Sequence, residues 1–154
     1  MEIKDSGARR EFETGAVRDI QEGKGRCDLI PLDVITFITG NPTFYYIDEF
    51  TRTGDTKCLR DALVQSGVFN SLYTMILEVS IHFEAGCNKY GENNWKKGIP
   101  THCYIDSGVR HYLKYLRGDT DEPHARAFVW NILCCIWTCE HRPELNDYEN
   151  TSKS

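Results

Sequence analysis

Apolar residues recur at intervals of three and four in residues 68–90 and 102–117, and residues 123–139 are almost continuously apolar. This spacing matches the period of an α-helix, so each segment is predicted to bury one helical face. The acidic residues 119–122 and Pro123 suit the start of the last helix. The spacing therefore predicts a mainly helical domain with three or four core helices.

The segments outside these helices have different compositions. Residues 1–28 are polar and rich in glycine, and we expect them to fold as an extended segment over one end of the helices. Residues 30–38 can form a helix that ends at the breaker Gly40-Asn41-Pro42. The aromatic residues 43–50 are predicted to form a short strand or an insertion packed against the body, followed by a loop at 51–56.

The predicted fold class is mainly α: a small helical bundle with an N-terminal extended segment packed over it and an aromatic insertion. A chain of 154 residues is long enough for one substantial core. Residues 1–142 are expected to form this single domain, and the polar residues 143–154 a flexible tail.

The net charge of −5 argues against binding to duplex nucleic acid or to an anionic membrane. No apolar run approaches the roughly 20 residues that span a bilayer. The seven cysteines are odd in number and do not have zinc-site spacing, and no signal-like segment begins the chain. We therefore expect a cytoplasmic protein whose cysteines are reduced and buried.

Glycines lie beside basic residues in the strings 14–19 and 23–28, a pattern that suits a backbone approaching an anion. Acids and histidines also fall within apolar helices, where ionisable groups are costly without partners. Helical spacing aligns Glu78 with His82, which are also a common helix pair. If such rows of polar residues on neighbouring helices faced one another, they would form a polar pocket within the bundle. Together these features favour a phosphate-bearing ligand such as a nucleotide.

Glu78 and Asp106 are expected to bind Mg²⁺ or Mn²⁺ through carboxylate oxygens. Basic side chains would bind phosphate oxygens, and aromatic side chains would stack on a base. The candidate ligand-binding residues are Arg18, Lys24, Arg26, Phe83, Lys89, Tyr90, Asn94, Trp95, Arg110, His111, Lys114, His124 and Asn131.

Several of these residues also have purely structural explanations. Asp106 and Arg110 are four residues apart and can simply pair with each other. His124 can cap its helix or pair with Asp121. Asn131 lies in an apolar helix, where a buried amide needs hydrogen-bond partners whether or not it contacts a ligand.

Six strings resemble one phage-associated family, the N-terminal domain of dATP/dGTP diphosphohydrolases, whose members are associated with enzymes similar to the MazG pyrophosphohydrolases. They occur in order between about residues 5 and 139, interrupted by the aromatic insertion at 37–56. The strings are Gly15–Asp19, Glu22–Pro31, His82–Gly86, Lys89–Ile99, Asp106–His111 and Trp130–Asn131.

The resemblance implies a mostly helical nucleotide-handling protein that acts on purine deoxynucleoside triphosphates with a divalent metal, in the host cytoplasm if the chain is viral. For such a hydrolase, Glu78 or Glu84 would orient the attacking water, and His82 is the third candidate catalytic residue. MazG-like enzymes bind metal through Glu-x-x-Glu and Glu-x-x-Asp pairs, which the central helices of this chain lack. Glu78 and Asp106 would have to replace them.

Three functions are therefore carried forward. The first is a metal-dependent diphosphohydrolase that cuts a phosphoanhydride bond of dATP or dGTP. The second is a non-catalytic nucleotide-binding module that sequesters a host signal nucleotide or regulates a partner. The third is a helical assembly protein in which buried polar residues such as Asn131 set the register. A homo-oligomer is expected in each case, because long apolar helices in a small domain leave a face to cover.

Overall fold

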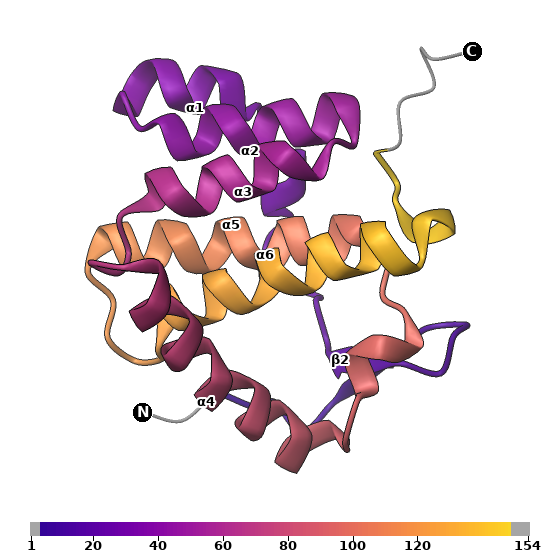
Figure 1. Cartoon of the computed structure of the whole chain (residues 1–154). Coiled ribbons are helices and arrows are strands. Elements are labelled where there is room, and N and C mark those ends of the chain that lie inside the picture. The colour runs from indigo at the N-terminus through magenta and orange to yellow at the C-terminus, as the bar shows by residue number, and fades with distance from the viewer. Residues whose placement is uncertain (1–3, 149–154) are drawn as a thin grey trace.

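The structure is a computed structural model that describes residues 4–148. Six α-helices make up most of this part of the chain, and a two-stranded sheet precedes them (Figure 1). The fold class predicted from the sequence is confirmed. The helices are α1 (Leu32–Thr39), α2 (Pro42–Thr53), α3 (Thr56–Ser66), α4 (Leu72–Tyr90), α5 (Thr101–Arg117) and α6 (His124–His141).

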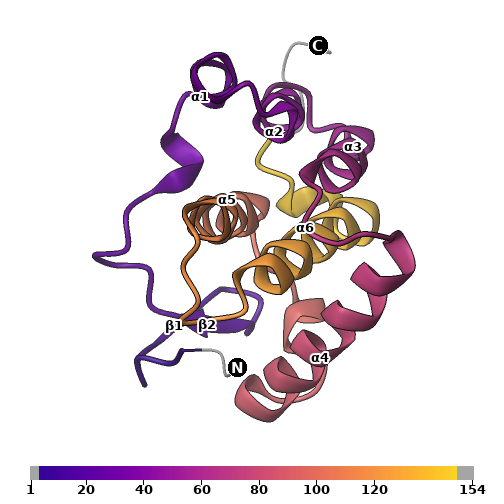
Figure 2. The ribbon, with the colours of Figure 1, turned by 90° about the vertical axis from the view of Figure 1, so that its left-hand side faces the viewer.

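Helices α5 and α6 pack against each other at the centre, with α1, α2 and α3 on one side and α4 on another (Figure 2). Their contact face is apolar, and the side chains of Tyr104 and Ile105 on α5 and Phe128 and Ile132 on α6 are fully buried. Gly108 of α5 faces α6 at the point where Ile132 packs closely against its backbone. Burial of this face is the main source of stability for the bundle.

The N-terminal segment forms a hairpin of β1 (Arg9–Glu11) and β2 (Val17–Asp19). The two strands are antiparallel, with Arg10 opposite Arg18. The short 3-10 helix η2 (Asn94–Lys97) fixes the hairpin in place, because the Asn94 side chain accepts a hydrogen bond from the Val17 N–H and donates one to the Val17 carbonyl, each at 2.8 Å. The hairpin thereby covers the end of the bundle near α4 and α5 (Figure 2).

The aromatic residues 43–50 lie within α2, so the predicted strand is wrong, and so is most of the predicted loop at 51–56. Asn41 caps α2 by accepting a hydrogen bond from the Thr43 N–H at 3.0 Å, and Pro42 occupies the first turn, where its missing N–H costs nothing. The buried aromatic residues Phe44 and Phe50 lie on one helical face with Ile47 between them.

The seven cysteines are all free thiols, but they are not all buried. Cys134 and Cys135 lie in the core of α6, where burial raises the pKa of both thiols well above the ordinary value. Cys87 on α4 is exposed, which corrects the expectation that every cysteine is buried.

Residues 143–148 pack against the domain, although the sequence suggested a flexible tail from residue 143 onwards. The 3-10 helix η3 (Pro143–Leu145) follows α6 directly, and the Tyr148 ring meets the Phe50 ring edge-on at 5.5 Å. Residues 149–154 of the predicted tail lie outside the described residues.

His102 at the start of α5 holds this C-terminal segment through Asp147, with 2.6 Å between Nδ1 and Oδ2. The hydrogen bond to Asp147 raises the pKa of His102 from 6.5 to about 10.

The raised pKa of His102 makes its contribution to stability depend on pH. This contribution is complete at a pH below the pKa of the unfolded state, and it is lost at a pH above the pKa of the folded state. We expect the stability advantage of the wild type over His102→Asn to shrink between pH 6.5 and pH 10 in urea unfolding. A constant advantage across this range would contradict the assignment.

Apolar side chains are exposed along the outer face of α4, where Tyr73, Leu77 and Ile81 are among the exposed residues, and Phe37 on α1 is 90% exposed. The homo-oligomer predicted from the sequence would use such a face, and it stays a prediction. No helix within residues 4–148 combines the length and the apolar character needed to cross a membrane.

Candidate functional site

A cavity of about 510 Å³ lies between the hairpin, the C-terminal half of α4, and the facing sides of α5 and α6. Its size is in the range of pockets that bind small molecules. The hairpin and the segment after it supply one wall, including Arg10, Arg18 and Lys24. Helix α4 contributes His82, and Trp130 of α6 lies across from it.

Basic residues outnumber acidic residues around this cavity, although the whole chain is acidic. The seven basic residues in the lining are Lys4, Arg10, Arg18, Lys24, Lys89, Arg110 and Lys114. The four acidic residues in the lining are Asp5, Asp19, Asp106 and Glu122. The cavity therefore attracts anions while the surface as a whole does not.

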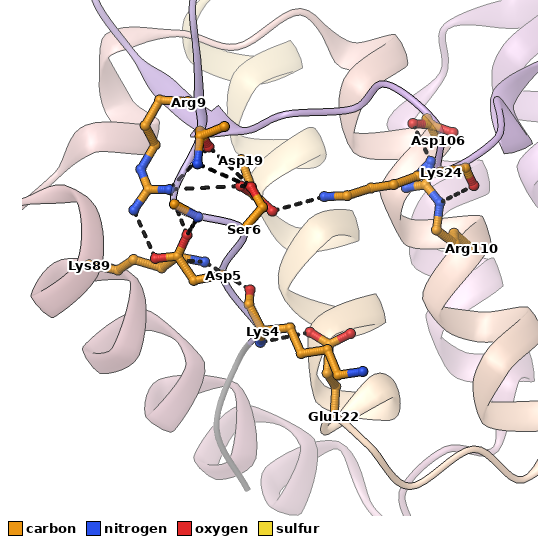
Figure 3. Close-up of polar contacts among 12 residues, drawn as sticks. Lys4, Asp5, Ser6, Arg9, Asp19, Lys24, Lys89, Asp106, Arg110 and Glu122 are labelled. Carbon is orange, nitrogen blue, oxygen red and sulfur yellow. Dashed lines mark hydrogen bonds and ion pairs between the residues drawn. The ribbon is translucent and has the colours of Figure 1, made fainter.

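Four of the basic side chains are already neutralised by ion pairs, three of which lie within the view of Figure 3. Lys24 Nζ lies 3.0 Å from Asp19 Oδ2, and Arg110 Nη2 lies 2.6 Å from Asp106 Oδ2. The other two pairs are Lys4–Asp121 at 2.8 Å and Lys89–Asp5 at 3.7 Å. These residues shape the wall, and their charges are largely balanced.

Arg10, Arg18 and Lys114 have no carboxylate partner among residues 4–148. Arg10 and Arg18 are opposite each other on the two strands, where like charges are destabilising. Arg10 Nε is buried without a hydrogen-bond partner in the described structure. The cavity lining therefore carries three positive charges that no carboxylate in the described part of the chain balances.

The Arg18 guanidinium is held in place by neutral groups. Nη2 donates to the Asn131 side-chain oxygen at 3.1 Å, and Nη1 donates to the Cys103 carbonyl at 3.3 Å. The guanidinium also lies over the Tyr104 and Trp130 rings, 5.4 and 5.7 Å from their centroids. These contacts orient Arg18 and leave its positive charge available to a ligand.

Asn131 is buried, as its position in an apolar helix suggested. Its amide nitrogen donates to the Ala127 carbonyl at 2.8 Å while its oxygen accepts from Arg18. The amide thus has the partners that the sequence requires, and one of them is a candidate ligand-binding residue.

Aromatic side chains form another part of the cavity lining. The Phe83 ring centroid lies 5.4 Å from that of Trp95 and 5.9 Å from that of Trp130. Trp130 Nε1 and His82 Nδ1 are buried and make no hydrogen bond in the described part of the chain. Burial, with a smaller effect of nearby cations, lowers the pKa of His82 to about 3, so its imidazole is neutral. This wall offers flat rings and unpaired polar atoms, which suits a heteroaromatic base.

A chain of polar contacts lies at the edge of the cavity, where α5 meets the start of α6. His111 Nδ1 and His124 Nδ1 are 2.9 Å apart, and His124 Nε2 is 2.7 Å from Asp121 Oδ1. Burial, followed by the effect of His124, lowers the pKa of His111 well below its ordinary value. Of the two alternatives for His124, the structure shows the pairing with Asp121.

Most of the predicted ligand-binding residues line this one cavity. They are Arg18, Lys24, Phe83, Lys89, Tyr90, Asn94, Trp95, Arg110, His111, Lys114 and Asn131. His124 is absent from the lining but contacts His111, whereas Arg26 is exposed and pairs with Asp28 at 2.7 Å. Their roles in binding stay predictions.

Only some of the predicted catalytic and metal-binding residues line the cavity. His82 and Asp106 line the cavity, but Glu78 and the exposed Glu84 do not. Asp106 accepts hydrogen bonds from the Cys27 N–H at 2.7 Å and from Arg110 at 2.6 Å. The structure therefore does not assemble Glu78 and Asp106 into a carboxylate site at the cavity.

Arg10 and Glu122 also line the cavity but were not predicted from the sequence. The register of the hairpin places Arg10 beside Arg18, and a sequence does not reveal that register. Glu122 lies next to Pro123 at the predicted start of α6. The sequence feature that could have identified it is its position two residues before His124, which was a candidate.

The fold and the cavity together define a mainly helical protein with a cationic, aromatic-walled pocket. The sequence model of the family described as dATP/dGTP diphosphohydrolase, N-terminal, matches residues 52–148. The chain belongs to this family. The match covers the later strings that carried the resemblance, from His82 onwards, and the hairpin precedes it. No curated protein and no solved structure matches the chain.

Proposed function

We propose that the chain binds a purine deoxynucleoside triphosphate in this cavity and hydrolyses one of its phosphoanhydride bonds. The family description supplies the nucleotide class and the reaction class. The observation that carries the proposal is the pair Arg10 and Arg18, opposite each other on neighbouring strands and both without a carboxylate partner in the described structure. A triphosphate between them would turn their repulsion into attraction.

Lys114 extends this cationic surface along α5. In the proposed reaction, the oxygen of water bonds to phosphorus and its proton passes to solvent, while the bridging P–O bond breaks and the electron pair leaves on the departing phosphate oxygen. Fixed cations stabilise that charge as it develops, and this is the dominant protein contribution to phosphoryl transfer. The aromatic wall around Phe83 and Trp130 would hold the base.

The residues in the cavity do not fit a resident Mg²⁺ or Mn²⁺ ion held by Glu78 and Asp106. Asp106 is occupied by N–H donors, and Glu78 lies outside the lining. Asp5 and Asp19 in the lining are paired with basic residues as well. Such ions commonly bind through substrate phosphates with few protein ligands, so Mg²⁺ or Mn²⁺ would enter the cavity together with the triphosphate.

A second candidate is a nucleotide-binding module without turnover, which sequesters a nucleotide or regulates a partner. The engagement of Asp106 by Arg110 favours this alternative, because it leaves the phosphate side of the cavity short of free carboxylates. Both candidates predict binding at the same place, and only the fate of the nucleotide separates them.

Incubation of the purified full chain with dATP or dGTP and either metal, followed by chromatography, tests the hydrolase. We expect a nucleotide product with fewer phosphates, and less of it from ATP and GTP. Intact nucleotide with binding that EDTA leaves unchanged would favour the binding module. Absence of both turnover and binding would refute the two candidates together.

A further inference from the structure

We propose that His111, Glu122 and His124 bind one divalent transition-metal ion of the zinc class at the edge of the cavity. One ligand atom from each residue lies within 4.8 Å of the others. Two imidazole nitrogens and one carboxylate oxygen suit Zn²⁺ and its neighbours, whereas Mg²⁺ prefers oxygen ligands alone. This site differs in residues and in metal class from the carboxylate site expected from the sequence.

The spacing of the two histidines fits a shared ion closely. Nitrogens bound to one tetrahedral Zn²⁺ at about 2.1 Å are about 3.4 Å apart. His111 Nδ1 and His124 Nδ1 are 2.9 Å apart, so a separation larger by about half an ångström admits the ion. Because the His124 proton lies on Nε2 towards Asp121, the His111 Nδ1–H donates the hydrogen bond to His124 Nδ1. On metal binding, the proton on His111 Nδ1 moves through solvent to Nε2, and both rings bind as neutral imidazoles.

The surroundings of His124 already have the arrangement found behind metal-bound histidines. Its Nε2 is 2.7 Å from Asp121 Oδ1, which fixes the tautomer that leaves the Nδ1 lone pair free for a metal. Lys4 Nζ holds the other Asp121 oxygen at 2.8 Å. His124 itself is 2% exposed, so its ring is rigidly placed. Asp121 therefore acts on the ion through His124.

Glu122 completes the set with a carboxylate oxygen that is still available. Glu122 Oε1 accepts a hydrogen bond from the Lys4 backbone N–H at 3.0 Å (Figure 3). The other oxygen makes no hydrogen bond or ion pair within residues 4–148. By contrast, the nearby group of Asp119, Asp121 and His124 has both acids in ion pairs, with Arg117 and Lys4.

An ion at this site would lie at the wall of the cavity, where it could contact a bound ligand. His111 and Glu122 line the cavity, and Lys114 lies one turn further along α5. Three protein ligands leave a fourth tetrahedral position for water or a ligand oxygen, as in catalytic zinc sites.

Titration of the EDTA-treated full chain with Co²⁺ tests the site by absorption spectroscopy, and Zn²⁺ should displace the Co²⁺ band. We expect one ion per chain and at least a tenfold loss of affinity in each of Glu122→Gln and His124→Asn. Asp121→Asn should lose affinity by about 10- to 100-fold while keeping the same ligands. His102→Asn is the matched control, since His102 also pairs with an aspartate but lies outside the lining.

Two results would overturn the proposal: a wild-type chain that takes up no Co²⁺, or a Glu122→Gln variant that binds it as tightly as the wild type. Glu122 is only half-buried, so this variant remains informative even where His124→Asn fails to fold. The readout does not involve nucleotide, and failure of this site is therefore distinguishable from failure of the proposed hydrolysis.

Discussion

Replacing Arg18 by alanine is expected to weaken binding of dATP or dGTP by about 10- to 100-fold, because a hydrogen bond to a charged group contributes about 1.5 to 3 kcal/mol. The Arg18 guanidinium has neutral hydrogen-bond partners and aromatic neighbours but no carboxylate in the described structure. Its charge is thus available to a phosphate. Isothermal titration calorimetry of the variant and the wild type measures the loss.

Two companion variants separate charge from packing. Arg18→Lys keeps the charge but not the planar fork, and should recover part of the affinity. Arg60→Ala removes a surface arginine whose side chain is 80% exposed and should leave binding unchanged. If Arg18→Ala binds nucleotide as the wild type does while remaining folded by circular dichroism, the nucleotide does not occupy this part of the cavity.

The helices that build the cavity were predictable because their apolar residues follow the helical period. Residues 68–90, 102–117 and 123–139 correspond to α4, α5 and α6 within a few residues at each end. Each of these helices contributes residues to the buried core. The period identifies the buried face of a helix whatever its partner is, so tertiary contacts did not need to be known.

Helix α2 shows where this reasoning fails. Tyr45 and Tyr46 are β-favouring residues, and they stand among other aromatic residues at 43–50. Phe44, Ile47 and Phe50 are all buried at steps of three residues, which fits one helical face and not the alternation of a strand. The local signals for the helix were Asn41 and Pro42, which begin a helix as readily as they break one. Context therefore overrode residue preference.

The sequence predicted many of the residues that line the cavity, but it did not predict which of them lie next to each other. A helical wheel aligned Glu78 with His82, but it does not show how far along α4 the neighbouring segments reach, and only His82 lines the cavity. The position of Arg10 depends on the hairpin register, and the contact between His111 and His124 depends on how α5 approaches α6. These are tertiary facts that no local pattern contains.

Asp106→Ala is expected to lower the free energy of unfolding by about 3 kcal/mol, because breaking a buried ion pair leaves its partner uncompensated. Asp106 is 3% exposed, and the Arg110 side chain with which it pairs is 12% exposed. The same carboxylate accepts the Cys27 N–H, so its loss also releases the segment before α1. Urea unfolding measures the change, with Asp61→Ala on the more exposed α3 surface as the control.

Asp106→Ala and Asp106→Asn together decide whether Asp106 has a structural role or binds a metal ion. Asn at this position can still accept the Cys27 N–H, so Asp106→Asn should lose less stability than Asp106→Ala. If Asp106 is structural, both variants keep the wild-type affinity for Mn²⁺ in the presence of nucleotide while losing stability. If it binds metal, as the sequence suggested, both lose the ion. Because Arg110 and the Cys27 N–H already occupy its oxygens, we expect the first result. An unchanged stability with lost metal binding would return Asp106 to the metal site.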